Sequence, residues 1–133
     1  MKRMSFPYEN EERLKRKLPL CKIYLLGKNN RVPVRVLIDS GATDTILPIN
    51  AAMDAGIKIP KLDFPIQYGG GQTNGVRIRT YFEIGARRLH ADIVFVEKLE
   101  FPYGLLGRKG VFDEFNEVAF SERPLYPFVE FRW

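Results

Sequence analysis

The chain has 133 residues, of which 45% are hydrophobic and 28% charged, as is typical of a single globular domain with a hydrophobic core. Its single cysteine, Cys21, excludes an intrachain disulfide and a cysteine cluster for zinc or iron–sulfur. No run approaches about 18 consecutive apolar residues, which excludes a membrane-spanning helix. We therefore expect a cytoplasmic protein in a reducing compartment, with no membrane contact and no metal or other cofactor.

The net charge of +5 comes from the N-terminal part of the chain. Residues 1–38 contain ten Lys and Arg against three Asp and Glu, whereas residues 39–133 contain eleven against thirteen. The densest basic cluster, residues 13–17, has no aromatic side chains that could stack on bases. A solvated segment is therefore favoured over a nucleic-acid-binding one.

Residues 1–18 are predicted to be a charged N-terminal leader, and residues 19–133 the folded domain. The leader shows no period that could bury one face, so it is either a loose arm or an extra strand. Beyond it, residues 20–26 and 32–38 are rich in apolar and β-branched side chains and flank a Gly-Lys-Asn-Asn turn. This pattern predicts a β-hairpin that ends directly at Asp39.

The middle of the chain alternates short strands with glycine-containing turns. Residues 49–56 predict a short helix, with Asn50 as its N-cap and Gly56 as its stop. Strand patterns at 64–68 and 76–84 flank the glycine-rich residues 69–75, which predicts a mobile hairpin.

The C-terminal part continues the same alternation. Residues 89–96 predict another strand, and residues 109–115 a brief helix. Residues 117–120 and 128–131 predict a final hairpin around a proline-containing turn. The chain as a whole is predicted to be all-β with one or two short helices.

Most catalytic chemistries are excluded by the residues that the chain lacks. It has one histidine, His90, at an outward-facing strand position, and no Gly-x-Ser-x-Gly sequence, which excludes a serine-hydrolase triad. Several His or Cys ligands for a hydrolytic metal are missing, and no phosphate-binding glycine pattern is complete. Carboxylate chemistry remains, and Asp39 is its best candidate because a charge next to a buried strand is costly without a function.

The segment Leu-Ile-Asp-Ser-Gly-Ala-Thr at residues 37–43 resembles the signature of aspartic proteases. The later Gly-Leu-Leu-Gly-Arg at residues 104–108 resembles the second motif of the retroviral-type, retropepsin-like members, and a glycine-rich hairpin lies between the two motifs. The resemblance covers about residues 20–131. It implies a closed, β-barrel-like acid-protease fold and an endopeptidase that cleaves extended apolar polypeptide segments.

The resemblance also assigns roles to individual residues. Asp39 would be the catalytic carboxylate, and the glycine-rich hairpin would be a flap that closes over the substrate. Support of the active-site loop would fall to Ser40, Gly41, Ala42, Thr43, Asp44 and Arg108, and the flap would comprise Tyr68, Gly69, Gly70, Gly71 and Gln72. Because the chain contains one Asp-Ser-Gly only, the second carboxylate of the dyad has to come from a second copy, which implies a homodimer.

The chain departs from the viral pattern in two places. Thr43 stands where an acidic residue often pairs with the motif arginine, and Asp44 is the nearest substitute. The leader is also longer than a minimal member needs, and since chain ends build the dimer sheet in viral members, a different interface is implied. The alternative function is a peptide-binding or scaffold module on the same dimeric fold, in which Asp39 only caps a turn.

Overall fold

The computed structural model describes residues 1–28, 30–61, 64–68 and 71–133. Strands predominate in it, accompanied by the α-helix α1 (Ile49–Ala55) and the 3-10 helix η1 (Phe112–Glu114). The strands are β1 (Arg3–Pro7), β2 (Glu9–Glu11), β3 (Arg16–Leu18), β4 (Leu20–Leu26), β5 (Arg31–Ile38), β6 (Ile46–Pro48), β7 (Phe64–Tyr68), β8 (Gly71–Ile84), β9 (Arg87–Val96), β10 (Gly104–Leu106), β11 (Glu117–Ser121) and β12 (Phe128–Arg132). The predicted all-β class is confirmed.

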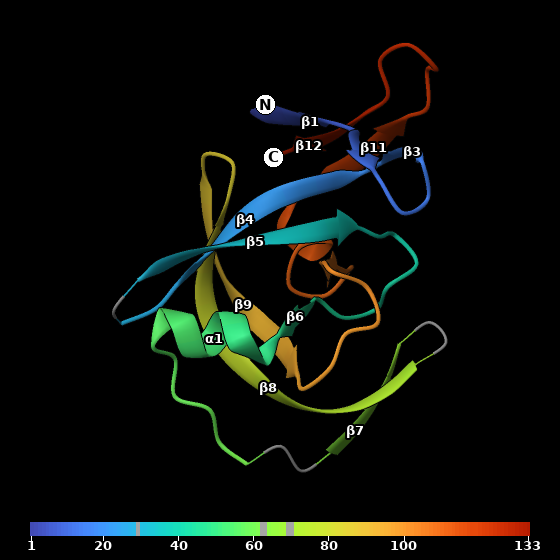
Figure 1. Ribbon diagram of the computed structural model, residues 1–133. Coiled ribbons are helices and arrows are strands. Elements are labelled where there is room, and N and C mark those ends of the chain that lie inside the picture. Colours follow the sequence, from blue (N-terminus) through green and yellow to red (C-terminus); the bar gives the residue numbers. More distant parts are fainter. Residues whose placement is uncertain (29, 62–63, 69–70) are drawn as a thin grey trace.

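The largest sheet closes on itself as a ring of hydrogen-bonded strands (Figure 1). Its strand order is β4-β5-β10-β6-β9-β8-β7, and an additional pairing between β4 and β8 completes the ring. Most neighbours are antiparallel, but β10 runs parallel to β5, and β6 runs parallel to β9. The parallel pairing of β5 with β10 brings the ends of these two strands to the same edge, where Asp39 follows β5.

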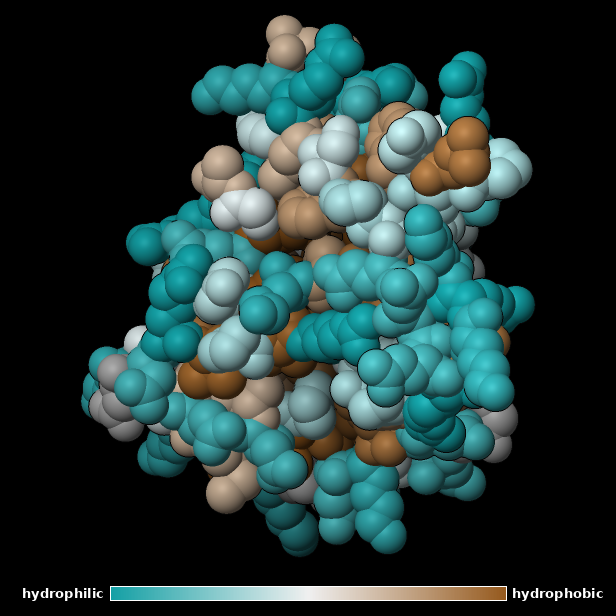
Figure 2. Space-filling view, turned by 45° about the horizontal axis from the view of Figure 1, so that its top comes forward, coloured by the Kyte–Doolittle hydropathy of each residue, from teal (hydrophilic) through white to brown (hydrophobic). Residues whose placement is uncertain are grey.

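The core lies inside this ring because successive strand residues point to opposite faces. In β5 the inward residues Val34, Val36 and Ile38 are buried, whereas Arg31, Pro33 and Arg35 are exposed. In the view of Figure 2, hydrophilic side chains cover most of the face and hydrophobic ones show in the hollows between them. No helix in the described part of the chain is long and apolar enough to cross a lipid bilayer.

Helix α1 packs its alanines against the sheet. Ala51, Ala52 and Ala55 are buried, and Gly56 ends the helix in the left-handed conformation, with a φ of 79°. The predicted Gly56 stop is confirmed, but the predicted Asn50 cap is wrong. Pro48 occupies the N-cap position, two residues before Asn50, because its fixed φ suits the entry into the first turn.

The N-terminal segment belongs to a second, three-stranded sheet of order β1-β12-β11. Strand β1 pairs antiparallel with β12, so the two chain ends lie side by side (Figure 1). Residues 1–18 were expected to be either a loose arm or an extra strand, and the structure has strands there. Besides β1, strands β2 and β3 form a small hairpin. The expectation that no face is buried is wrong for β1, because Met4 and Phe6 alternate with exposed residues and pack against the core.

The predicted helix at residues 109–115 is shorter than expected. It is reduced to the 3-10 turn η1, and Gly110 just before it has a φ of 92°, a conformation that no α-helix contains. Phe115 nevertheless packs on Phe131 of β12, with ring centroids 4.8 Å apart. The aromatic residues of this region therefore connect the small sheet to the core of the ring.

Glu130, a buried residue of β12, lies at the centre of the contacts between β1 and β12. It accepts hydrogen bonds from Arg132 Nε at 2.6 Å and from Ser5 Oγ at 3.5 Å, and Arg3 Nη1 lies 3.9 Å away. The Arg132 hydrogen bond holds the pKa of Glu130 below its ordinary value of 4.5. Above that pH the ionised carboxylate therefore stabilises the fold, and the stabilisation is lost as pH falls through the lowered pKa.

We expect Glu130→Gln to lower the free energy of unfolding near neutral pH. The free energy of unfolding of the variant should also decrease less than that of wild type as the pH falls. As the pH falls, Glu130 takes up a proton at a higher pH in the unfolded chain than in the folded chain. The amide of the variant does not titrate, so this difference in proton binding is removed. Urea denaturation between about pH 3 and about pH 7 measures it. Glu100→Gln, at an exposed position, is the matched control, and curves for Glu130→Gln and wild type that stay parallel over this range contradict the expectation.

Candidate active site

Asp39 is the first residue after β5, and the backbone holds it in place on both sides. Its N–H donates to the carbonyl of Leu106 in β10 at 3.0 Å, and its carbonyl accepts a hydrogen bond from Ala42 N–H at 3.1 Å. Its carboxylate Oδ1 accepts the N–H of Gly41 at 2.9 Å, and the side chain is half-buried. The carboxylate is thus presented at the edge of the ring in one defined orientation, with its other oxygen free of protein donors among the described residues.

The Asp39 loop is joined to the loop after β10 by backbone hydrogen bonds. Arg108 N–H donates to the carbonyl of Ala42 at 2.9 Å, and Lys109 N–H donates to that of Thr43 at 2.8 Å. The two sequence motifs, far apart along the chain, therefore form one rigid unit. Rigid support of this kind is what keeps a reacting group in its productive geometry.

Thr45 is a site residue that the sequence analysis missed. It is fully buried, and its hydroxyl accepts Gly107 N–H at 3.1 Å and donates to the Lys109 carbonyl at 2.9 Å. The hydroxyl thus satisfies two backbone groups that would otherwise be buried without partners. The sequence signal for Thr45 was its place directly before the apolar Ile46, next to a segment expected to be buried.

Asp44 and Arg108 do not pair with each other. The Asp44 carboxylate accepts a hydrogen bond from Arg77 Nη1 of β8 at 3.1 Å, which ties the active-site loop to the strand that leads from the hairpin. Arg108 Nη2 donates to the hydroxyl of Thr43 at 3.3 Å. Asp44 is therefore not the substitute partner that the sequence suggested, and the basic residue that it meets comes from β8.

A cleft of about 520 Å³ lies beside Asp39. Its lining combines the end of β5 with residues of the N-terminal segment and of β11: Tyr8, Arg16, Lys17, Leu18, Pro19, Leu37, Ile38, Asp39, Ser40, Phe120 and Glu122. Tyr8 Oη donates to Glu122 Oε1 at 2.5 Å. Burial, and then this hydrogen bond, raise the pKa of the Tyr8 phenol well above its ordinary value of 10.0, so it remains a donor.

The remaining predicted residues fall on or near the β7–β8 hairpin. Tyr68 ends β7 and pairs with Gly71, the first residue of β8, and the exposed Gln72 pairs with Gln67. Gly69 and Gly70 lie outside the described residues. Strand β8 begins at Gly71, earlier than expected, because ladder pairing with β7 continues through residues 71–75 and overrides their glycine content.

The chemistry available at this site is that of carboxylates. Within the described residues, no group of three His, Cys, Asp or Glu side chains could hold a metal ion. The cleft contains two carboxylates, and Glu122 is already bonded to Tyr8. Glu122 is exposed, whereas Asp39 is half-buried and held by backbone hydrogen bonds at the end of β5, so Asp39 is the better candidate for the reacting carboxylate.

Comparison with known proteins agrees with this geometry. Residues 25–109 match the sequence profile of the family described as aspartyl protease. The fold is similar to that of a retropepsin-like aspartic protease from Rickettsia conorii, at 15% sequence identity and a TM-score of 0.60, over 97% of this chain and 92% of that one. It is also similar to EIAV protease in complex with the inhibitor HBY-793, at 20% identity and a TM-score of 0.53, over 69% of this chain and 83% of that one.

A search of curated proteins gave no match. The two structural likenesses show the fold, and the profile match, which spans more than half of the chain, shows the family. The chain belongs to the aspartyl protease family of hydrolases and has the retropepsin-like fold.

Proposed function

We propose that the chain is an endopeptidase that hydrolyses peptide bonds in extended apolar polypeptide segments, using a pair of Asp39 carboxylates from the two subunits of a homodimer. The observation that carries the proposal is the half-buried Asp39 carboxylate, which lines the cleft and is held by Gly41 N–H through one of its oxygens. One carboxylate of such a pair accepts a proton from water, whose oxygen attacks the peptide carbonyl. The other, protonated, donates its proton to the carbonyl oxygen, which gives a tetrahedral diol. When the C–N bond breaks, the first carboxyl gives the proton it took from water to the leaving amine nitrogen, and one hydroxyl of the diol returns its proton to the second carboxylate.

A second copy is required because one carboxylate cannot be base and acid at the same time. The chain has a single Asp-Ser-Gly, and Asp54, the other Asp two residues before a glycine, lies in helix α1. Two carboxylates a few ångströms apart share one proton, which produces both roles from identical residues on a two-fold axis. Pairing of β1 with β12 within one chain leaves the outer edges of β1 and β11 for contacts between copies.

The other predicted residues have roles in the same proposal. The backbone bonds of Ala42, Thr43 and Arg108 support a bracing role for the loop that also contains Ser40, Gly41 and Asp44. The β7–β8 hairpin, with Tyr68, Gly69, Gly70, Gly71 and Gln72, would be the flap over the substrate. Residues 19–133 would be the protease domain, and residues 1–18 an extension that walls the cleft. The single cysteine is a buried free thiol, which suits a cytoplasmic location.

The experiment that tests the proposal is incubation of the purified chain with an unfolded protein at mildly acidic pH, with new amino termini as the readout. Hydrolysis is expected, because a dyad that shares one proton is active where one member is ionised. If no new termini form at a concentration where the chain is dimeric, the hydrolytic function is refuted and the alternative, a peptide-binding or scaffold module, takes its place.

We expect the specific activity to fall on dilution, because a monomer holds half of the dyad. Activity per chain should therefore follow the fraction of dimer measured by analytical ultracentrifugation over the same concentration range. A specific activity that stays constant while the chain dissociates to monomers would contradict the shared site.

A further inference from the structure

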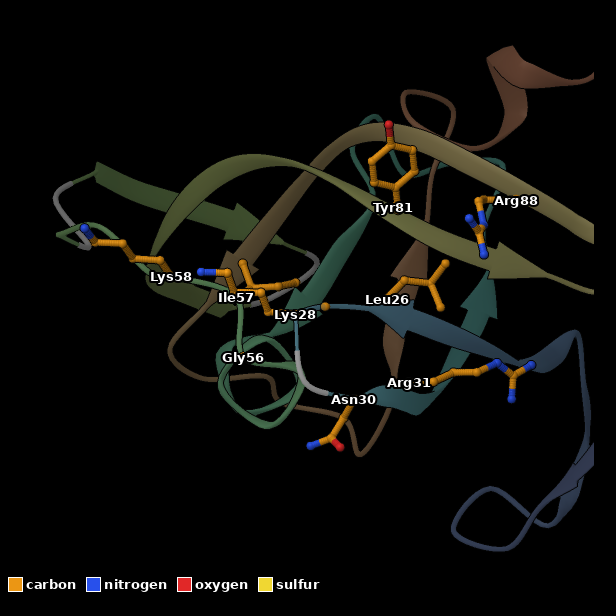
Figure 3. A pocket seen from close by; sticks show the side chains of 10 residues that line it. Leu26, Lys28, Asn30, Arg31, Gly56, Ile57, Lys58, Tyr81 and Arg88 are labelled. Atoms are coloured by element: carbon orange, nitrogen blue, oxygen red, sulfur yellow. The ribbon is translucent and has the colours of Figure 1, made fainter.

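A second hollow, far from Asp39, has a strongly basic rim. Its volume is about 700 Å³, and its lining comes from the turn between β4 and β5, the end of α1, and the paired strands β8 and β9 (Figure 3). The lining residues are Leu26, Gly27, Lys28, Asn30, Arg31, Gly56, Ile57, Lys58, Tyr81 and Arg88. Four of them carry a positive charge and none carries a negative charge. We call this hollow the basic pocket.

The floor of the basic pocket is fixed by contacts between the turn and the helix end. Asn30 Nδ2 donates to the carbonyl of Asp54 at 2.9 Å. Gly27 lies so close to the helix that an added Cβ would be 1.9 Å from the Ala55 carbonyl oxygen, so only glycine fits there. The pocket is thus part of the folded framework, and its position does not depend on an unsupported loop.

Most of the positive charge at the pocket has no ion-pair partner in the described part of the chain. Arg31 forms an ion pair with Glu83 at 2.8 Å, and its guanidinium lies 3.5 Å from the centre of the Tyr24 ring. By contrast, Lys28, Lys58 and Arg88 are exposed and form no ion pair with the residues that the structure describes. Three unpaired cations around one hollow attract an anionic partner.

The shape and lining of the basic pocket favour an acidic polypeptide over other anions. The exposed side chains of Lys28 and Lys58 lie on one side of the pocket and that of Arg88 on the other (Figure 3), which suits several anionic groups better than one small anion. The half-buried Leu26 and Ile57 add an apolar floor, which suits carboxylates interspersed with apolar side chains. Nucleic acid is expected to bind less well, because Tyr81, the aromatic residue of the lining, stacks on His90 at 4.0 Å. One face of its ring is therefore covered and cannot stack on a base.

We propose that the basic pocket is a docking site for an acidic segment of the polypeptide substrate, an inference that rests on the proposed function. The pocket lies at the start of β5 and Asp39 follows its end, so the two sites are about 25 Å apart along eight strand residues. An extended substrate spans that distance with about eight residues. The enzyme would therefore select substrates that have an acidic segment at this separation from the cleaved bond.

Binding of a fluorescein-labelled peptide of alternating Glu and Leu, followed by fluorescence anisotropy, tests the pocket without any need for hydrolysis. We expect the double substitution Lys28→Glu/Lys58→Glu to weaken binding about tenfold, and Lys28→Gln/Lys58→Gln to weaken it less. The matched control is Lys2→Glu/Lys22→Glu, which changes the net charge equally at exposed positions outside the pocket and should bind like wild type. Equal weakening in the control, unchanged binding in Lys28→Glu/Lys58→Glu, or tighter binding of poly(U) than of the peptide would overturn the proposal.

Kinetics with two peptide substrates, one with and one without an acidic tail about eight residues from the cleaved bond, test the role in substrate selection. The tail should lower KM for wild type and for the control variant but not for Lys28→Glu/Lys58→Glu, and kcat should stay unchanged. If the tailless peptide is hydrolysed and the tail brings no gain, the docking role fails while the protease function stands. If neither peptide is hydrolysed, the proposed function fails, and anisotropy alone decides whether the pocket binds acidic peptides.

Discussion

Asp39→Asn is expected to lower kcat for hydrolysis of an unfolded polypeptide by about 10³-fold or more, because an amide cannot accept the proton of the attacking water. The substitution preserves shape, and the amide Oδ1 can still accept the Gly41 N–H that the carboxylate accepts at 2.9 Å. The loop should therefore keep its conformation, and thermal unfolding should match wild type. The loss would be one of chemistry alone, measured as the rate of appearance of new amino termini.

Asp113→Asn is a close control for this experiment. Its carboxylate Oδ1 also accepts a glycine N–H, that of Gly110 at 3.1 Å, but Asp113 is not among the residues lining the cleft. The control variant should retain wild-type activity. Activity of Asp39→Asn equal to that of wild type, at equal folding, would refute the mechanism and leave Asp39 as a turn-capping residue.

Mixing the two forms of the chain extends the same test to the dimer. If the site contains Asp39 from both subunits, an excess of the Asp39→Asn chain should suppress wild-type activity by capturing wild-type subunits in mixed dimers. Suppression should increase with the proportion of variant chain. Activity that depends only on the amount of wild-type chain would show that each subunit works alone.

Gly107→Ala is expected to lower the free energy of unfolding by about 3 kcal/mol, because there is no room for a Cβ atom between the two loops of the site. The added atom would lie 2.2 Å from the Asp44 carbonyl oxygen and 2.9 Å from that of Ala42. Both neighbours are backbone atoms, and Thr45 and Arg108 bond this region on either side. The backbone can make room only by breaking those hydrogen bonds.

The measurement is urea denaturation of wild type, Gly107→Ala and a control glycine variant. Gly41→Ala adds the same methyl group, but its nearest neighbour is a side-chain atom, Asp39 Oδ1, at 3.2 Å. We expect this control to lose no more than about 1 kcal/mol. An unfolding midpoint of Gly107→Ala that equals that of Gly41→Ala would contradict the close packing of the two loops.

Much of the ring could be predicted from short stretches of sequence. The hairpin of β4 and β5, the place of Asp39 after β5 and the Gly56 stop of α1 depend on alternation and turn residues within a few positions of one another. The Asn50 cap failed at the same local level, because helix boundaries are decided by one or two residues and Pro48 competed for the position.

The contacts that complete the site could not be predicted in this way. Asp44 meets Arg77 of β8, and Tyr8 meets Glu122, 114 residues further along the chain. Thr45 owes its role to two backbone groups of the loop after β10. The partners of these residues could not be predicted, because each contact depends on where a strand ends and not on which residues are neighbours in the chain.

The sequence by itself was enough to predict carboxylate chemistry, because the chain has one histidine, one cysteine and a single Asp-Ser-Gly after an apolar strand. It also determined most of the strands, since side-chain alternation is a local property. Only the tertiary structure decided that β1 pairs with β12, that residues 8 and 16–19 line the cleft beside Asp39, and that one hollow is lined by three cations that form no ion pair with the described residues. Such features depend on contacts between chain ends and turns that are far apart in the sequence. No single stretch of sequence determines these contacts.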